Sequence, residues 1–355
     1  MAHIVLDSCA GRDGGREALE AAAIASLQLD HQITVVGDES AITDALAKIA
    51  HDAERLRVAH ARDRCEPDQD AADVLRQAPR NSIVVGLEIA ARDPSAVFVS
   101  AGAPGTIVAG AQQILNRIPG VPHAALAAVY PTLRPHGPVS DLFALLLDVG
   151  ATVECSGDDL VTFAAMGAAY ASKISRIDRP RVALLCNGHG IANAPVRARE
   201  AHRRLLAAKP AFEYVGCIRA DSVTSGDADV IVTDGFSGDV LLRTLEGVAA
   251  TGESLLRRAA EKFQWRVGVQ MLSDGISAIR EFTDWENYGG APLLGFGRAV
   301  VVTQADSGRR AFLNAIRLGA KIDRLQVIAA VSEGVAAFHG LSGPPRAPAP
   351  DPEAT

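Results

Sequence analysis

The chain is poor in cysteine, lysine and aromatic residues. Its five cysteines among 355 residues form an odd, scattered set without a C-x-x-C pair. Such a set is typical of reduced thiols, so we expect a cytoplasmic protein with neither a disulfide framework nor a zinc knuckle. Lysine supplies five of the 35 basic residues, no basic run is present, and the net charge is −7. This balance argues against a nucleic-acid partner, whose phosphates need clustered cations.

Long apolar runs and targeting segments are also missing. No apolar stretch approaches the roughly 18 residues that span a membrane. The first residues, MAHIVLDSCAG, pass directly into an expected strand without a cationic leader, so we expect no signal peptide. Since 48% of the residues are hydrophobic, the chain can still build a sizeable core.

Several catalytic and nucleotide-binding motifs are absent. No G-x-x-x-x-G-K-S/T loop and no H-E-x-x-H helix occur, which argues against a P-loop enzyme and a zinc protease. The segment GHGIAN (188–193) lacks the third glycine of a dinucleotide loop. GFSGD (235–239) departs from the nucleophile pattern G-x-S-x-G, so we interpret Ser237 as a loop or capping hydroxyl. Cys186 ends a strand and is interpreted as a core residue.

Short apolar segments alternate with helical stretches along the chain. Strands rich in Val, Ile and Leu, with helices between them, predict an α/β fold with a mainly parallel, doubly wound α/β/α sandwich. The expected helices include 17–28, 40–49, 105–117, 158–172, 194–208 and 238–261. The expected strands are 3–7, 33–38, 56–61, 96–102, 124–131, 144–150, 181–187, 212–217, 229–235 and 298–305.

Glycine-rich loops follow many of these strands, as in SAGAPGT (100–106) and TDGFSGD (233–239). Ligands of parallel sheets bind beyond the carboxyl ends of the strands, where helix N-termini attract anions. Asp7, Asp148 and Asp234 each end a strand, and we expect all three at this edge. The residues alone thus indicate an α/β protein that binds an anionic small molecule.

Several segments together resemble one protein family. They are LLLDVGATVEC (145–155), FAAMGAAYA (163–171), DGFSGDVLLRTLEGVA (234–249), YGGAPLLG (288–295) and AFLNAI (311–316). Their order and spacing, over about residues 1–338, are similar to the phosphate acyltransferases of bacterial phospholipid synthesis. The resemblance implies transfer of an acyl group from acyl carrier protein to inorganic phosphate.

The resemblance also implies an architecture. It implies a fold like that of isocitrate and isopropylmalate dehydrogenases, a homodimer, no metal, no nucleotide or other cofactor, and peripheral membrane contact. We expect one domain over 1–341, with a projecting helical pair at about 250–287, and a disordered Pro/Ala-rich tail over 342–355. An apolar tip on the pair is expected either to touch a membrane weakly or to pack across the dimer; it comprises Phe263, Trp265, Val267 and Met271.

The resemblance assigns site positions to the strand-end loops. The residues it implies as catalytic are His189, Asn193 and Asp239. The residues it implies for binding substrate or anion are Arg12, Gly11, Ser100, Gly102, Gly105, Asp234, Gly235, Gly238 and Ser307.

The polar loop tips depart from the family's patterns, whereas the segments expected to pack match well. This contrast favours a retained scaffold with an altered site. Asn193 stands where the family has a lysine, and Asp239 stands where it has an asparagine; both changes disfavour phosphate. Arg12 replaces an acid, and its guanidinium restores an anion site if it reaches the same pocket.

Two groups of residues keep alternative interpretations. Asp239 is either the N-cap of its helix or, with His189, a general base for a neutral acceptor. Arg134 and His136, in YPTLRPHGP, either meet an acidic carrier protein or are solvated loop residues.

Three functional hypotheses follow. The first is a cytoplasmic, homodimeric acyltransferase that moves an acyl group from acyl carrier protein or coenzyme A to phosphate. The second is a specialised paralogue in secondary metabolism that acylates an amine or an alcohol. The third is a protein that binds acyl carrier protein without catalysis. Phosphate dependence separates the first two, and carrier binding without turnover identifies the third.

Overall fold

The structure is a computed structural model that describes residues 1–9, 15–63, 71–138, 141–188, 190–208, 210–261 and 263–340. Its strands are β1 His3–Asp7, β2 Gln32–Gly37, β3 Leu56–His60, β4 Ala96–Ser100, β5 Ala125–His136, β6 Asp141–Leu147, β7 Arg181–Leu185, β8 Glu213–Ile218, β9 Val230–Val232, β10 Ala291–Leu294 and β11 Ala299–Val302. Within the described ranges they form one 11-stranded sheet in the order β3-β2-β1-β4-β11-β10-β5-β6-β9-β7-β8.

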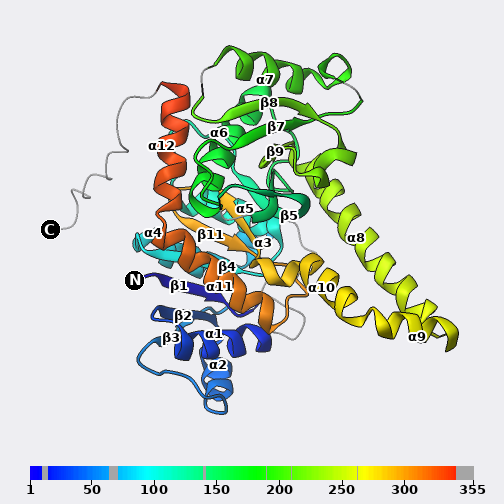
Figure 1. The fold of residues 1–355 in the computed structure, drawn as a ribbon. Coiled ribbons are helices and arrows are strands. Elements are labelled where there is room, and N and C mark those ends of the chain that lie inside the picture. Colours follow the sequence, from blue (N-terminus) through cyan, green and yellow to red (C-terminus); the bar gives the residue numbers. More distant parts are fainter. Residues whose placement is uncertain are drawn as a thin grey trace.

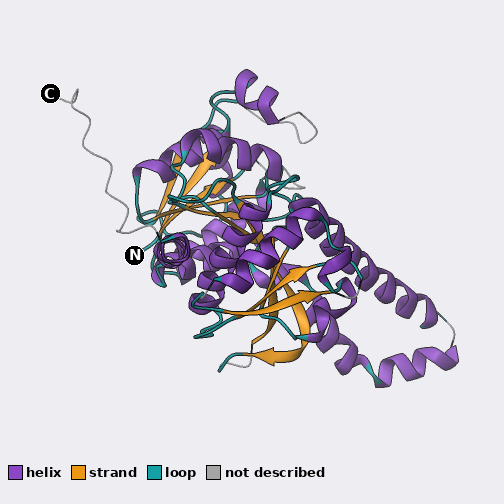
Figure 2. Cartoon of the chain, turned by 90° about the horizontal axis from the view of Figure 1, so that it is seen from above, coloured by secondary structure: helices purple, strands orange, loops and turns teal. Residues whose placement is uncertain are grey.

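Helices cover both faces of this sheet (Figures 1 and 2). The α-helices are α1 Arg16–Gln28, α2 Glu39–Leu46, α3 Ala71–Gln77, α4 Ser82–Arg92, α5 Pro104–Ile114, α6 Gly157–Ile174, α7 Val196–Ala207, α8 Gly235–Ala259, α9 Phe263–Met271, α10 Ser273–Thr283, α11 Arg309–Arg324 and α12 Val327–His339. Short 3-10 helices are η1 Ile191–Asn193, η2 Ala220–Ser225 and η3 Trp285–Tyr288. One face packs against α1, α6, α7, α11 and α12, and the other against α4 and α5.

Each strand supplies side chains to both layers of the core. In β1, Ile4 and Leu6 belong to one layer and Val5 belongs to the other. Successive side chains of a strand point to opposite faces, so a strand covered on both sides is apolar throughout. This explains the continuous apolar runs in the sequence and confirms the predicted α/β/α sandwich.

The direction of the strands changes in the middle of the sheet. β10, which is absent from the predicted strands, pairs antiparallel with both β11 and β5, and β5 pairs antiparallel with β6. β6, β9 and β7 therefore run opposite to β1, β4 and β11. The expectation that Asp7, Asp148 and Asp234 end their strands at one edge is wrong, because the β5–β6 hairpin reverses the strand direction.

Three consecutive helices, α8, α9 and α10, extend away from the sheet as an arm (Figure 1). The arm begins with the 25 residues of α8 and returns at α10, where the Phe282 ring lies 5.6 Å from that of Phe143. Many of its large apolar side chains are exposed: Phe236, Val240, Val248, Leu255, Leu256, Trp265, Val267, Met271, Leu272 and Ile279. The side chain of Phe263 and the predicted tail 342–355 lie outside the described part of the structure.

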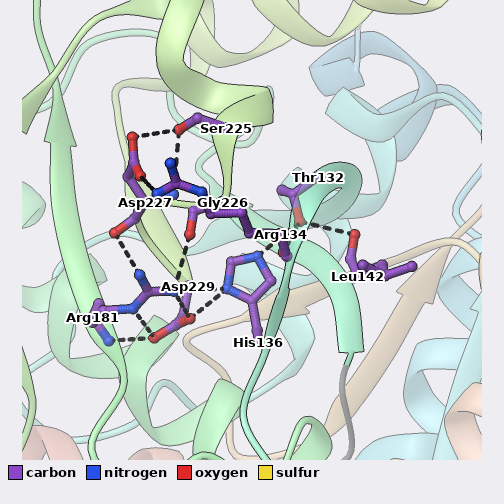
Figure 3. Close-up of polar contacts among 9 residues, drawn as sticks. All are labelled: Thr132, Arg134, His136, Leu142, Arg181, Ser225, Gly226, Asp227 and Asp229. Carbon is purple, nitrogen blue, oxygen red and sulfur yellow. Dashed lines mark hydrogen bonds and ion pairs between the residues drawn. The ribbon is translucent and has the colours of Figure 1, made fainter.

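A buried polar cluster joins β5, β7 and β9 (Figure 3). His136 Nδ1 lies 2.5 Å from Asp229 Oδ1, and its Nε2 lies 2.8 Å from the hydroxyl of Thr132. The guanidinium of Arg181 contacts the same Asp229 carboxylate at 2.8 Å. The cluster thus ties three strands together at their junction with the loop that contains Gly226, whose carbonyl also accepts from Arg181.

Neither interpretation of His136 from the sequence is correct. Its side chain is fully buried against Asp229, so it neither faces a partner nor meets solvent. Arg134 is exposed, but its guanidinium pairs with Asp227 at 2.8 Å. The pattern YPTLRPHGP gave no sign of this, because Asp229 is 93 residues away in the chain.

Asp234, and not Asp239, is the N-cap of α8. Its carboxylate accepts hydrogen bonds from the Ser237 N–H at 2.9 Å and from the Ser237 hydroxyl at 2.9 Å. Arg197 Nη2 donates to the same carboxylate at 2.8 Å. Asp239 lies one turn inside the helix, with a 47% exposed side chain 3.3 Å from Arg243. The interpretation of Asp239 as a cap is therefore wrong, since α8 begins at Gly235, earlier than predicted.

Replacing Asp229 tests the buried cluster. Burial alone would raise the pKa of Asp229, but hydrogen bonds from His136 and Arg181 hold that pKa at about 2. A depressed carboxyl pKa adds stability above the unfolded pKa, and this contribution is lost as pH falls through the folded pKa. We expect Asp229→Asn to lower the free energy of unfolding by about 3–5 kcal/mol at neutral pH. In urea titrations, the difference from the wild type should shrink by about 2 kcal/mol between about pH 4 and pH 2.

The exposed pair of Asp227 and Arg134 supplies the control. Asp227→Asn should change the free energy of unfolding by less than about 1 kcal/mol. Equal losses in the two variants would contradict the assignment of Asp229 as the centre of the cluster.

A second pair of variants tests the helix cap. Asp234→Ala removes the acceptor of Ser237 and Arg197, so we expect a loss of about 2–4 kcal/mol of unfolding free energy. Asp239→Ala removes only a half-exposed pair within the helix and should cost about 0.5 kcal/mol or less. Thermal and urea unfolding measure both values, and the reverse ranking would show that Asp239 is the cap.

Candidate functional site

Two cavities flank the first turns of α8. The apolar cavity, of about 380 Å³, is lined on α8 by Leu242, Arg243 and Glu246. The polar cavity, of about 670 Å³, is lined by Asp234 and Ser237. Ser237 and Leu242 are five residues apart, a rise of about 7–8 Å along a helix. Among the described residues, the two cavities have no lining residue in common.

The apolar cavity combines a hydrocarbon floor with a polar mouth. Its floor comes from one face of β5 and from the loop after β6, through Leu126, Ala128 and Val149. The loop after β11 supplies the mouth, with Thr303, Gln304 and Asp306. Such a lining suits a ligand with an apolar chain and a polar head.

Hydrogen bonds hold α8 over this cavity. Gln304 Nε2 donates to Glu246 Oε1 at 3.1 Å. Arg243 contacts Glu246 at 3.1 Å and Asp239 at 3.3 Å. Each pair is partly exposed and individually weak. Together they keep the guanidinium of Arg243 at the cavity mouth.

Predicted site residues on the loops after β4 and β11 fall into two groups. Ser100 is fully buried, donates to Asp7 at 2.7 Å and accepts from the Gly102 N–H at 2.9 Å. Ser307 is also buried and shares a 2.6 Å hydrogen bond with Thr303. These serines shape the loops beside the cavity. Gly102 itself lines the apolar cavity.

The polar cavity carries two arginines and two carboxylates. Arg197 pairs with Asp234 at 2.8 Å, and Arg219 pairs with Asp221 at 2.6 Å. Burial would raise the pKa of Asp234, but hydrogen bonds from the Ser237 N–H and from Arg197 hold it below its ordinary value. Guanidinium groups bind carboxylates and phosphates through charge-assisted hydrogen bonds, so this lining suits an anion.

The hydroxyl and the thiol in the polar cavity are committed to other contacts. Ser237 lies inside α8 and donates its hydroxyl to the N-cap Asp234 at 2.9 Å, so it is neither a loop residue nor the cap itself. A hydrogen bond with Cys217, together with burial, raises the pKa of Cys186 far above its ordinary value. A thiol without thiolate character is a poor nucleophile. The cavity thus offers binding groups rather than a covalent catalyst.

The loop after β6 fixes the start of α8. Backbone N–H groups of Leu126, Gly150, Ala151 and Thr152 donate to the Asp148 carboxylate at 2.7 to 3.1 Å. Burial raises the pKa of Asp148 to about 6 despite these bonds. A side chain at Gly238 would come within 1.9 Å of the Asp148 carbonyl oxygen.

Gly235 and Gly238 therefore serve close packing. A side chain at Gly235 would come within 2.7 Å of the Thr152 carbonyl oxygen, and the Gly235 N–H donates to that oxygen at 3.0 Å. This N–H and that of Ser237 are used inside the protein. The two glycines let α8 approach the loop that borders the apolar cavity.

The remaining predicted residues lie around the cavities or outside the described ranges. Asn193 is exposed in η1, near Gly188, which lines the polar cavity. Asp239 lies between the two cavities, alongside Gly150. Gly105 is exposed on the first turn of α5. Gly11, Arg12 and His189 belong to segments that the structure does not describe.

Three arginines at the cavities, Arg197, Arg219 and Arg243, were not identified from the sequence. Arg197 stands on α7, in a run of arginines that reads as a solvated helix face. Arg243 follows Asp239 by four residues, a spacing that predicts a pair on one helix face but no ligand site. Only the placement of both helices beside β9 and β5 brings these charges to the cavities.

In the part of the chain that the structure describes, no helix is both long and apolar enough to cross a membrane. No group of three or more His, Cys, Asp or Glu side chains in these ranges is placed to hold a metal ion. The four described cysteines, Cys9, Cys155, Cys186 and Cys217, form no disulfide with one another.

The chain is similar to known proteins along most of its length. Residues 2–330 match the model of a family described as fatty acid synthesis protein. The phosphate acyltransferase of Myxococcus xanthus (strain DK1622) is 35% identical over 317 residues, which cover 88% of each chain. A phosphotransacetylase from Streptococcus pyogenes shares the fold, with a TM-score of 0.57, 15% identity and 94% coverage of each chain.

A 4-hydroxythreonine-4-phosphate dehydrogenase from Salmonella typhimurium also shares the fold, with a TM-score of 0.50, 10% identity and coverage of 91% of this chain and 99% of that chain. At such low identity, the two solved structures support the fold alone. The family match and the identity to the Myxococcus protein extend over both cavities and the helices that form them. On these grounds, the chain belongs to the fatty acid synthesis protein family, and to the branch whose curated relatives are phosphate acyltransferases.

Proposed function

We propose that this protein transfers an acyl group from a thioester to inorganic phosphate and so forms an acyl phosphate. The observation that carries the proposal is the pair of cavities on α8, one suited to a hydrocarbon chain and the other to an anion. The name of its relatives, phosphate acyltransferase, supports the same reaction. A paralogue with another acceptor has no comparable support.

The proposed step is a direct displacement at the thioester. A phosphate oxygen attacks the carbonyl carbon, the C–O bond forms, and the C–S bond breaks. The sulfur leaves with the electron pair and takes a proton from solvent. Phosphate is already an anion, so the step needs a cation near phosphate and donors near the carbonyl oxygen rather than a protein nucleophile. This agrees with the hydrogen bond from the Ser237 hydroxyl to Asp234 and with the raised pKa of Cys186, which leave neither group as a ready nucleophile.

The two cavities suggest how the reactants are arranged. The acyl chain lies on Leu126 and Ala128, and the thioester lies at the mouth near Arg243. Phosphate lies on the side of the polar cavity, which Arg197 and Arg219 line. In this arrangement, the reacting groups meet along the first three turns of α8, between Ser237 and Arg243.

Asp239 adds to the negative charge that opposes phosphate in this arrangement, beside Asp221 and Asp234 of the polar cavity. A carboxylate about 4 Å from a bound phosphate costs on the order of 4 kcal/mol at an effective dielectric near 20. Here Asp239 is about half exposed and pairs with Arg243 at 3.3 Å, so solvent and the guanidinium both reduce that repulsion. An anion can therefore bind in the presence of Asp239, but we expect the affinity for phosphate to rise when its charge is removed.

Two finer features of the proposal concern the donor and its compartment. We propose acyl carrier protein as the carrier of the acyl group, with coenzyme A as the simpler substitute, because the family is described by its part in fatty acid synthesis. We also propose a cytoplasmic location, which suits the lack of a disulfide among the described cysteines.

The test is thioester consumption by the purified protein, with acyl carrier protein and coenzyme A donors, as phosphate is varied. We expect turnover to rise with phosphate and to saturate. In Asp239→Asn, the KM for phosphate should fall about threefold to tenfold, because a negative charge between the cavities is removed.

Glu253→Gln is the matched control, because Glu253 is also on α8 and also pairs with an arginine four residues later, at 3.0 Å. It should leave the KM for phosphate unchanged. A rate of thioester consumption that does not depend on the phosphate concentration would refute phosphate as the acceptor. Loss of turnover in Asp239→Asn, with an amine or alcohol as acceptor, would instead support the general-base interpretation.

We further propose that the arm forms a homodimer. Its exposed apolar side chains, which include Val248, Leu255 and Trp265, gather on one projecting segment. A monomer rarely exposes so many neighbouring apolar groups. Sedimentation equilibrium should therefore give twice the chain mass, and Leu255→Glu should yield a monomer with an unchanged melting profile at low protein concentration. A monomeric wild-type protein would exclude this arrangement.

A further inference from the structure

We infer that the acyl chain does not end in the apolar cavity but passes Tyr288 into a second cavity on the opposite face of the sheet, so that this rear cavity sets the preferred chain length. The inference rests on the proposed function, because it concerns the same acyl group. The rear cavity has a volume of about 270 Å³. Nothing in the sequence pattern indicated it.

The two cavities share three residues. Val129, Tyr288 and Gly290 line both the apolar cavity and the rear cavity. Leu126 and Ala128 belong to the core layer on the α8 side, whereas Ala127 and Val129 belong to the other layer. Because side chains of β5 alternate between faces, the cavities lie on opposite faces of the same strand. They meet at the start of β10.

The start of β10 leaves little side-chain volume between them. Gly289 and Gly290 have φ values of 83° and 88°, which only glycine adopts without strain. A side chain at Gly290 would come within 2.6 Å of the Val302 carbonyl oxygen. Tyr288, the next large residue, has its ring 4.5 Å from that of Phe143 and its hydroxyl donating to the Phe282 carbonyl. Its half-buried ring is thus held at the junction.

The walls of the rear cavity suit a hydrocarbon chain. On one side they come from the strands β5, β6 and β10. On the other side they come from the helices α6 and α11. The apolar wall residues are Ala127, Val129, Phe143, Leu145, Ala171, Ile174, Pro292 and Leu318. Apolar walls on all these elements bury a chain from water, and each buried methylene adds about fourfold to affinity.

The rear cavity also has a polar end, which sets a limit. Leu145 pairs with Val129, and Asp141 stands four residues earlier on β6, about 13 Å farther from the junction. Asp141 and Lys321 line that end, and they attract each other electrostatically. Asp229 also lines the cavity, but its carboxylate is bound by His136 and Arg181. Once an acyl chain reaches this charged end, further methylenes do not increase its affinity.

The expected consequence is a rise in catalytic efficiency with chain length that ends abruptly. The apolar cavity accommodates a short acyl group without the rear cavity. Longer acyl groups bind more tightly as more of their methylenes enter the rear cavity, until the chain reaches Asp141 and Lys321. We therefore expect a clear preference for long over medium chains in the wild-type protein.

The experiment fills the rear cavity from α11. Phosphate-dependent kcat/KM is measured with butyryl, octanoyl, lauroyl and palmitoyl thioesters of coenzyme A, for the wild type and for Leu318→Trp. We expect the ratio of palmitoyl to octanoyl efficiency to fall at least tenfold in Leu318→Trp. Leu27→Trp, on the exposed surface of α1, is the matched control and should keep the wild-type ratio.

Two further measurements keep the inference separate from the proposed function and from misfolding. Calorimetric binding of the same thioesters without phosphate should show the same loss of long-chain preference in Leu318→Trp, and this readout needs no turnover. If Leu318→Trp melts well below the wild type, the smaller Leu318→Phe replaces it. An unchanged chain-length profile in a folded filling variant would overturn the inference. Absence of any thioester binding in the wild-type protein would overturn the proposed function itself.

Discussion

The contact between the start of α8 and the loop after β6 is the constraint on which the site depends. Gly235 and Gly238 allow the helix backbone to approach Asp148 and Thr152 more closely than any side chain would permit. Asp148 in turn holds its own loop by accepting four backbone N–H groups. This contact sets the position of α8, and with it the separation of the polar cavity from the apolar one. The two glycines of this segment are thus explained by packing rather than by direct ligand binding.

From that position, α8 brings groups of opposite character to one place. The N-cap Asp234 and the first-turn residue Ser237 line the polar cavity. Leu242, in the third turn, lies over the apolar floor formed by β5. Arginines enter from both sides, Arg197 from α7 and Arg243 from α8 itself. The arrangement places arginines and apolar side chains along one helix, which supports the proposed direct displacement of a thioester by phosphate.

Much of the fold could be predicted from the sequence, whereas only part of the site could. The segment 3–7 was predicted as a strand and is β1, because a strand buried on both faces is apolar throughout. β10 escaped notice because it has only four residues, follows two glycines and contains Pro292. Asp239 was considered as a cap because glycines disfavour helix, yet Gly235 and Gly238 are helical where close packing requires them. Arg197 could not be distinguished from its neighbours on α7, since only long-range packing brings it to Asp234.

The central claim is that phosphate attacks the thioester directly, in the site bordered by α8. The most direct test is to supply phosphate labelled with oxygen-18 on every oxygen and to analyse the acylated product by mass spectrometry and phosphorus NMR. The account predicts an acyl phosphate in which all four labelled oxygens remain, including the one that bridges carbon and phosphorus. Release of the acyl group as a free acid or an amide, with no label transferred to it, would contradict the account.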